Sequence, residues 1–133
     1  MTARSRSGLT TVRLDHDGGG RWLLDGVACP RLDGCLDVDL EASALTNTFP
    51  VHRFSLAGRA AGPVDAPAAF VRAPTGAVER LEQSYRWLPD SPDGPRFAYA
   101  APVFDVSCVL AYDASGLVLD YPGLAVRTEQ LDP

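Results

Sequence analysis

Two aspartates that alternate with apolar residues are the side chains whose spacing best suits chemistry. Asp37 and Asp39 fall on one face of an expected strand at 36–40, roughly 7 Å apart at the usual strand rise. Glycosidase carboxylate pairs lie roughly 5–9.5 Å apart, so one hypothesis is a small hydrolase that acts on an ester or glycoside. The pattern favours a plainer interpretation, in which the two carboxylates are solvated or pair with arginines such as Arg53 or Arg127.

Metal and thiol chemistry find little support. A metal site would need His52 beside Asp37 or Asp39, and the chain has two histidines, with no cluster of His or Cys. Cys35 has acidic neighbours, which disfavour a thiolate nucleophile. We therefore predict no metal, no cofactor and no catalytic residue. The three cysteines form no CxxC pair and suggest free thiols in a reducing cytoplasm.

A polar corner precedes Pro50. Its side chains could hold a turn through bonds to the backbone, or Asn47 and Thr48 could face a sugar or another polar head group. Aromatic residues could stack on a sugar, although in a small β-protein they more often fill the core. The candidate ligand-binding residues are Asp37, Asp39, Asn47, Thr48, His52, Arg53, Tyr85, Asp120 and Tyr121.

Length and charge bound the class of protein. The chain has 133 residues and 46% hydrophobic residues, which suits a single globular domain at 1–133. Its net charge of -5, from 12 basic and 17 acidic residues, argues against nucleic acid and against a polybasic membrane anchor. No apolar run is long enough to span a membrane.

Short apolar runs between turn signals predict an all-β fold: one strongly curved antiparallel sheet, a half-barrel or open barrel, with at most a short helical turn at 42–49. Residues 1–8 are expected to be disordered. Pro67 interrupts the run at 64–71, which predicts an edge strand through which two copies could pair. The expected strands are 9–14, 21–24, 36–40, 51–56, 64–71, 79–88, 103–112, 117–121 and 124–127. The run at 79–88 is ambiguous, because its apolar residues also fit helical spacing, and the all-β context favours a strand.

The clearest local structure is a hairpin near the C-terminus. A loop at 113–116 joins the strands at 103–112 and 117–121, with Gly116 available for a left-handed conformation. Pairing Tyr112 with Leu117 would place Leu110 opposite Leu119 and gather the apolar side chains on one face.

Three blocks carry a resemblance to a known family. LDGCLDVDL at 32–40, TNTFPVHR at 46–53 and GLVLDYPGL at 116–124 resemble, in order and spacing, the bacterial family named "putative glycolipid-binding". The resemblance spans residues 9–128. Family members usually have a longer N-terminal segment, and they tend to carry Arg where this chain has His52. If that position holds an anionic head group, His52 would do so only when protonated, below about pH 6.5.

The resemblance implies a half-barrel similar to the lipoprotein-localisation factors, and non-catalytic binding of a glycolipid or another amphiphile in the concave face. We expect polar recognition at the mouth by Asn47, His52 and Arg53. A structural module that uses an exposed sheet edge is a further alternative to the hydrolase. The apolar residues expected to fill the concavity are Leu36, Val38, Leu110 and Leu119.

Overall fold

Strands dominate the fold, and the sheets they form do not close. The predicted all-β, open half-barrel class is therefore confirmed. The computed structural model describes residues 3–7, 10–41, 43–57, 62–73, 75–89, 92, 94–123 and 125–126.

An antiparallel sheet forms the N-terminal part, in the order β1-β2-β3-β4. The expectation of disorder at residues 1–8 is wrong for Ala3–Ser7, which forms a strand that pairs with the next one. The following two strands correspond to those predicted at 9–14 and 21–24, and they form a hairpin in which Leu14 pairs with Leu24. The four strands are β1 (Ala3–Ser7), β2 (Thr10–His16), β3 (Trp22–Leu24) and β4 (Val27–Ala28).

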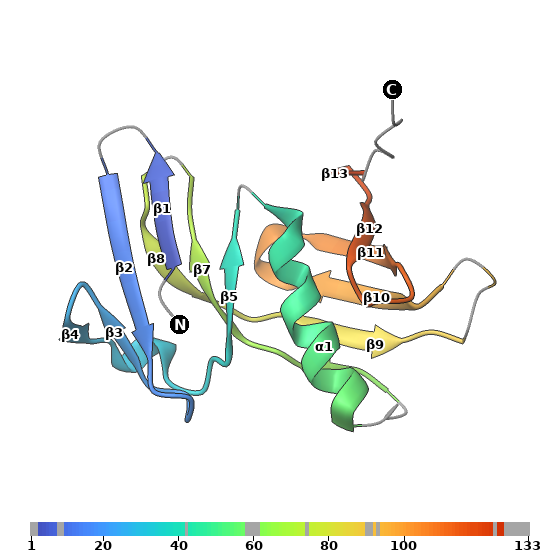
Figure 1. Ribbon diagram of the computed structural model, residues 1–133, viewed down its shortest axis with the longest axis horizontal. Helices are drawn as coiled ribbons and strands as arrows, with labels where there is room; N and C mark the ends of the chain where they lie inside the picture. The colour runs from blue at the N-terminus through green and yellow to red at the C-terminus, as the bar shows by residue number, and fades with distance from the viewer. Residues whose placement is uncertain are drawn as a thin grey trace.

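A three-stranded sheet lies between the N-terminal sheet and the C-terminal strands (Figure 1). Its order is β5-β7-β8, and its first two strands run parallel, which differs from the purely antiparallel prediction. The predicted edge is also wrong at residues 68–71, because β7 lies in the middle and its residues are buried. The strands are β5 (Asp37–Leu40), β7 (Ala68–Val71) and β8 (Val78–Leu81).

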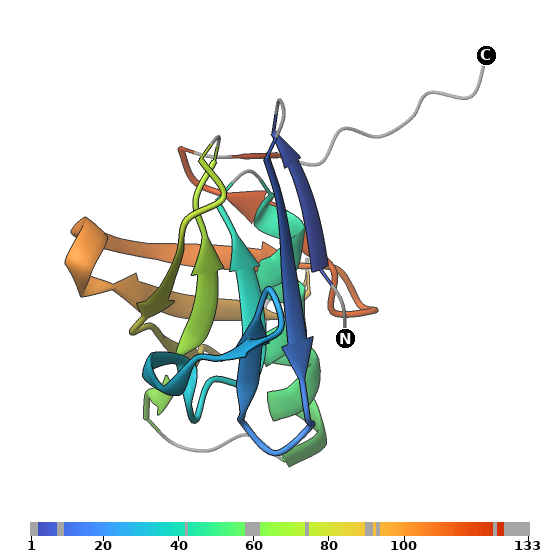
Figure 2. The same ribbon diagram turned by 90° about the vertical axis from the view of Figure 1, so that its left-hand side faces the viewer.

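The C-terminal strands form a six-stranded antiparallel sheet in the order β13-β12-β11-β10-β9-β6. Figure 2 shows β10 and β11 running across the direction of β5 and β7 at a steep angle. The strands are β6 (Val64–Asp65), β9 (Ser84–Trp87), β10 (Arg96–Ala101), β11 (Val106–Tyr112), β12 (Val118–Tyr121) and β13 (Ala125–Val126).

One bent hairpin joins these two sheets. Its first arm contains β6 and β7, its second contains β8 and β9, and each arm changes sheet at its middle. At the corner, the Ala66 N–H donates to the Gln83 carbonyl at 2.8 Å, so pairing continues through the bend. The ambiguous run at 79–88 is thus two strands, and Pro67 marks the corner of the first arm.

The expected strand at 51–56 is instead helix α1 (Thr48–Ala57), which follows the 3₁₀ helix η2 (Ala44–Asn47). A run as short as 51–56 is compatible with the periodicity of either element. Pro50 lies in the first turn of α1, where the missing N–H has little cost. Two further 3₁₀ turns are η1 (Pro30–Leu32) and η3 (Pro102–Phe104).

The C-terminal hairpin has the predicted loop but a different register. Gly116 has a φ of 80°, and the Asp113 carboxylate accepts from the N–H groups of Ser115 and Leu117 at 2.9 and 3.0 Å. These bonds hold Leu117 in the loop, so Tyr112 pairs with Val118 and the register shifts beside Ala111. Val118 consequently enters the core where Leu117 was expected.

A buried amide fixes η2 and α1 to the six-stranded sheet. Asn47 Nδ2 donates to the Tyr85 hydroxyl at 2.9 Å, and the Tyr112 hydroxyl donates to the Asn47 carbonyl at 3.0 Å. All three residues are at most 3% exposed. We call this group the Asn47 clamp. It joins two segments that are far apart in the sequence.

Asn47→Ala is expected to lower the free energy of unfolding by about 1–3 kcal/mol, because the buried Tyr85 hydroxyl loses the hydrogen bond that it accepts from Asn47 Nδ2. In a double-mutant cycle with Tyr85→Phe, urea unfolding should give a coupling of about 1 kcal/mol. Tyr121→Phe is the matched control, since no bond joins its hydroxyl to Asn47. Fully additive effects of Asn47→Ala and Tyr85→Phe would contradict the clamp.

Candidate ligand cavity

A cavity of about 380 Å³ opens between the three-stranded sheet and the six-stranded sheet. Strand β5, η2 and the connection between them supply its polar side, which includes Asp39, Glu41, Ser43 and Asn47. Strands β7, β8, β10, β11 and β12, with η3, supply its apolar side. The principal apolar side chains are Phe70, Leu81, Tyr99, Phe104, Val106 and Tyr121. The lining is therefore amphipathic.

Asp39 is the buried charge of this cavity, with 8% of the residue exposed. Among the described residues, the Thr46 hydroxyl is its hydrogen-bond partner, with Oγ1 3.3 Å from Oδ1. The same hydroxyl lies 2.9 Å from the Ser43 carbonyl, and its single proton can be donated to only one of these acceptors at a time. Burial raises the pKa of the Asp39 carboxyl to about 6, against a smaller lowering effect of Thr46.

Aromatic rings form the opposite wall. The Tyr99 and Tyr121 rings meet edge to face at a centroid distance of 5.8 Å, and the Phe70 and Phe104 rings lie 5.1 Å apart. The Tyr99 hydroxyl donates to Gln83 Oε1 at 2.8 Å. Burial raises the pKa of both phenols, that of Tyr121 to about 12, so both stay uncharged at neutral pH.

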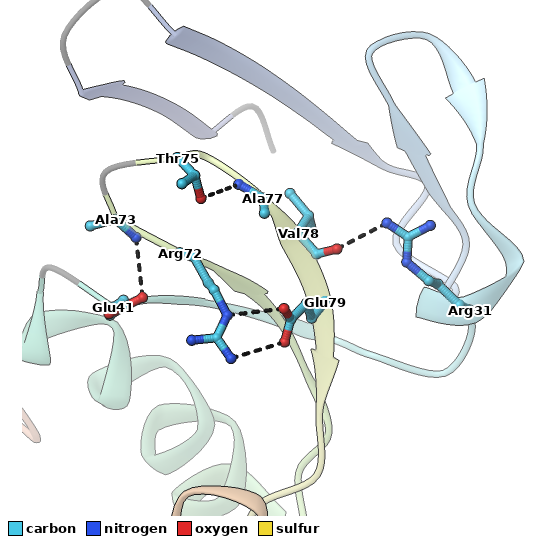
Figure 3. Close-up of polar contacts among 8 residues, drawn as sticks. All are labelled: Arg31, Glu41, Arg72, Ala73, Thr75, Ala77, Val78 and Glu79. Atoms are coloured by element: carbon cyan, nitrogen blue, oxygen red, sulfur yellow. Dashed lines mark hydrogen bonds and ion pairs between the residues drawn. The ribbon is translucent and has the colours of Figure 1, made fainter.

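Arg72 lies at the mouth, held by an acidic partner. Its Nε donates to Glu79 Oε1 at 2.9 Å and its Nη2 to Oε2 at 3.3 Å, the fork visible in Figure 3. The guanidinium carbon is 5.6 Å from the centre of the Phe70 ring and 5.3 Å from that of Phe104. Nearby, Glu41 Oε2 accepts from the Ala73 N–H at 3.2 Å.

The structure brings three of the predicted site residues to this cavity: Asp39, Asn47 and Tyr121. Tyr85 lies behind Asn47 as part of the Asn47 clamp. Asp120 lies on β12, where its backbone pairs with Ala111 and Val126.

The other predicted residues lie elsewhere. Arg53 Nη2 donates to Asp37 Oδ2 at 2.5 Å, which confirms the predicted pairing with an arginine, although Asp37 is buried rather than solvated. Arg127, the other suggested partner, lies outside the described residues. Thr48 Oγ1 accepts from the Val118 N–H at 3.4 Å, and the exposed His52 packs beside Gly116.

None of the four apolar residues expected to fill the concavity lines this cavity. Leu36 is 43% exposed, Val38 belongs to the core beneath the N-terminal sheet, and Leu110 is fully buried behind the aromatic wall. Leu119 is half-buried on β12. The apolar residues that do line the cavity, such as Phe70 and Phe104, are brought there by contacts between sheets. No local sequence pattern predicts such contacts. Arg72 was missed for the same reason.

Cys35 is fully buried, and burial raises the pKa of its thiol, which disfavours the thiolate needed for nucleophilic attack. A second hollow of about 490 Å³ lies over Trp22 between β2, β3 and η1. It contains none of the predicted site residues.

Comparisons with known proteins agree on the family. The sequence model of the family described as "Putative glycolipid-binding" matches residues 1–127. A solved structure of a DUF1089 family protein from Pseudomonas aeruginosa is similar, with a TM-score of 0.76 and 35% sequence identity. The match covers 90% of this chain and 62% of that protein, so this chain spans less than two thirds of its solved relative. The comparison with curated proteins gave no match. No helix within the described residues is long and apolar enough to cross a membrane.

Asp39→Asn is expected to stabilise the empty protein at neutral pH. The pKa of Asp39 is higher in the folded chain than the ordinary value of 3.8, so the free energy of unfolding falls as pH rises from about 4 to about 6. The variant lacks this cost and should be more stable by about 2–3 kcal/mol at pH 7.5, with the difference vanishing near pH 4.

Urea unfolding between pH 4 and 8 measures this difference. Asp65→Asn, at an exposed position on β6, is the matched control and should show no comparable effect. A constant difference between Asp39→Asn and wild type across that range would contradict the assignment.

Proposed function

The chain belongs to the family described as "Putative glycolipid-binding", and from that premise we propose that it binds an amphiphile, a glycolipid or a similar lipid, in the cavity between its three-stranded and six-stranded sheets. The observation that carries this proposal is the amphipathic lining. A buried carboxylate and an amide lie on one side, and aromatic and aliphatic side chains lie on the other. Binding is non-catalytic in this proposal.

The size of the cavity supports a small head group or part of a chain. Ligand sites usually enclose roughly 300–1,000 Å³ and combine apolar walls with a few polar groups. At about 380 Å³, this cavity lies at the lower end of that range. A sugar ring with the first part of an acyl chain fits such a space better than a whole lipid does. The remainder of the ligand would extend through the mouth beside Arg72 and Phe104.

Three free cysteines, two of them buried, suit a reducing compartment, so we propose a cytoplasmic location. We also propose that two copies of the chain could pair through an exposed sheet edge, since β6 is an outer strand of the six-stranded sheet.

One observation favours a second function, hydrolysis of a glycoside. Asp39 has a raised pKa, as a general acid needs, and Glu41, directly after the end of β5, also lines the cavity. Asp37, the partner first considered, is bonded to Arg53 and does not line the cavity. Release of free sugar from an aryl glycoside, lost in Asp39→Asn and retained in Asp65→Asn, would support the hydrolase.

Filling the cavity should abolish binding. Val106 lines the cavity from β11, whereas Val109 lies on the same strand and is 43% exposed. Val106→Trp is expected to lower the affinity for n-octyl β-D-glucopyranoside at least tenfold in isothermal titration calorimetry. Val109→Trp, the matched control, should bind as wild type does. Thermal melts establish that both variants fold.

Native mass spectrometry of the protein purified from its host provides an independent measurement. Co-purified lipid is expected on wild type and on Val109→Trp, and is expected to be absent from Val106→Trp. The absence of lipid on wild type, together with no thermal shift from a lipid panel, would overturn the proposal.

A further inference from the structure

The charges around the cavity are unbalanced. The charged residues of its lining are Asp39, Glu41 and Arg72. Arg72 is engaged by both oxygens of Glu79, a bidentate arrangement that neutralises its charge and fixes its orientation. Asp39 and Glu41 therefore leave an excess of negative charge toward the ligand. An anionic head group placed there meets repulsion that a neutral one does not.

Among the described residues, Asp39 has fewer hydrogen-bond donors than a carboxylate of its burial normally has. A carboxylate can accept several hydrogen bonds, and a buried one normally does. Here the recorded donor is Thr46, whose hydroxyl lies closer to the Ser43 carbonyl than to Asp39. The oxygens of Asp39 are thus available to hydroxyl donors that enter the cavity. Hydrogen bonds to a charged acceptor are the stronger kind.

Neighbouring hydroxyls on a sugar ring are the donors that fit this arrangement. Two hydroxyls can bond to the two oxygens of one carboxylate, while the apolar face of the ring rests against Tyr99 and Tyr121. A phosphate group offers mainly acceptors at neutral pH and brings its own negative charge. Both properties oppose its binding beside Asp39.

Resting on the proposed function, we infer that Asp39 recognises the head group of the ligand. Its carboxylate makes the cavity select uncharged, hydroxyl-rich head groups over phosphate-bearing ones. This assigns a role to a side chain that the fold does not need. The same carboxylate accepts hydrogen bonds from sugar hydroxyls and repels a negatively charged phosphate.

Protonation of Asp39 should weaken the selection. The groups that face it are Thr46 from η2, the phenols of Tyr85, Tyr99 and Tyr121 from the six-stranded sheet, and Glu41 and Arg72 at the mouth. Burial raises the pKa of all three phenols, so these stay neutral between pH 5 and 7.5. Any pH dependence of head-group selectivity that comes from the other groups should also appear in Asp39→Asn between pH 5 and 7.5.

The test compares n-octyl β-D-glucopyranoside with n-octyl phosphate, which share a chain and differ in head group. Isothermal titration calorimetry at pH 7.5 should give at least tenfold tighter binding of the glucoside to wild type. Asp39→Asn should bind the glucoside about tenfold more weakly and the phosphate more tightly. Asp65→Asn changes the net charge equally at an exposed position and should retain the wild-type ratio.

At pH 5, wild type should move toward the glucoside-to-phosphate ratio of Asp39→Asn, while the ratio of Asp39→Asn itself should change little. Equal ratios in wild type and Asp39→Asn at pH 7.5 would overturn the role of Asp39. If Val106→Trp still abolished binding in that case, the cavity would remain the ligand site. Failure of wild type to bind either probe would overturn both this inference and the proposed function.

Discussion

The Asn47 clamp is the interaction on which the arrangement of the cavity depends. Asn47 joins a 3₁₀ turn that follows β5 to two tyrosines of the six-stranded sheet, through its side-chain amide to Tyr85 and through its backbone carbonyl to Tyr112. Buried polar groups without partners are costly, so the segment can adopt few other positions. The clamp thereby fixes the distance between the polar and aromatic sides of the cavity. The same residue supports the wall and forms part of it.

A second constraint is the bend in the hairpin that contains β6, β7, β8 and β9. Because both arms change direction together, the sheets cross at a steep angle and cannot pack flat against each other. Side chains at the crossing fill most of the space, and the remaining volume is the cavity. Pro67 and the bond between Ala66 and Gln83 lie at the bend itself.

Much of the fold could be predicted from local pattern. Turn residues located the C-terminal loop, and alternation located β2, β5 and β11. The helix was missed because six residues, 51–56, are too few to separate the two periodicities, and because Pro50 is compatible both with the first turn of a helix and with a turn before a strand. The hairpin register failed because the bonds made by Asp113 retain Leu117 in the loop.

The site was less predictable than the fold. Asp39 and Asn47 could be proposed from their polarity within apolar surroundings, and the Asp37–Arg53 pair from charge. Arg72, Phe70 and Phe104 reach the cavity through strand β7 and turn η3, whose positions follow from long-range packing. Nothing in the sequence near these residues indicates that they meet Asp39.

Strand β7 is buried on both faces, with Phe70 in one core and Ala69 and Val71 in the other. Since protein interiors are closely packed, a change of side-chain size on this buried strand would disturb its neighbours. The exposed rim of the cavity, at positions such as Glu41, would tolerate substitution more readily than this strand. Lineages that adopt new ligands would alter that rim while retaining the same central strand.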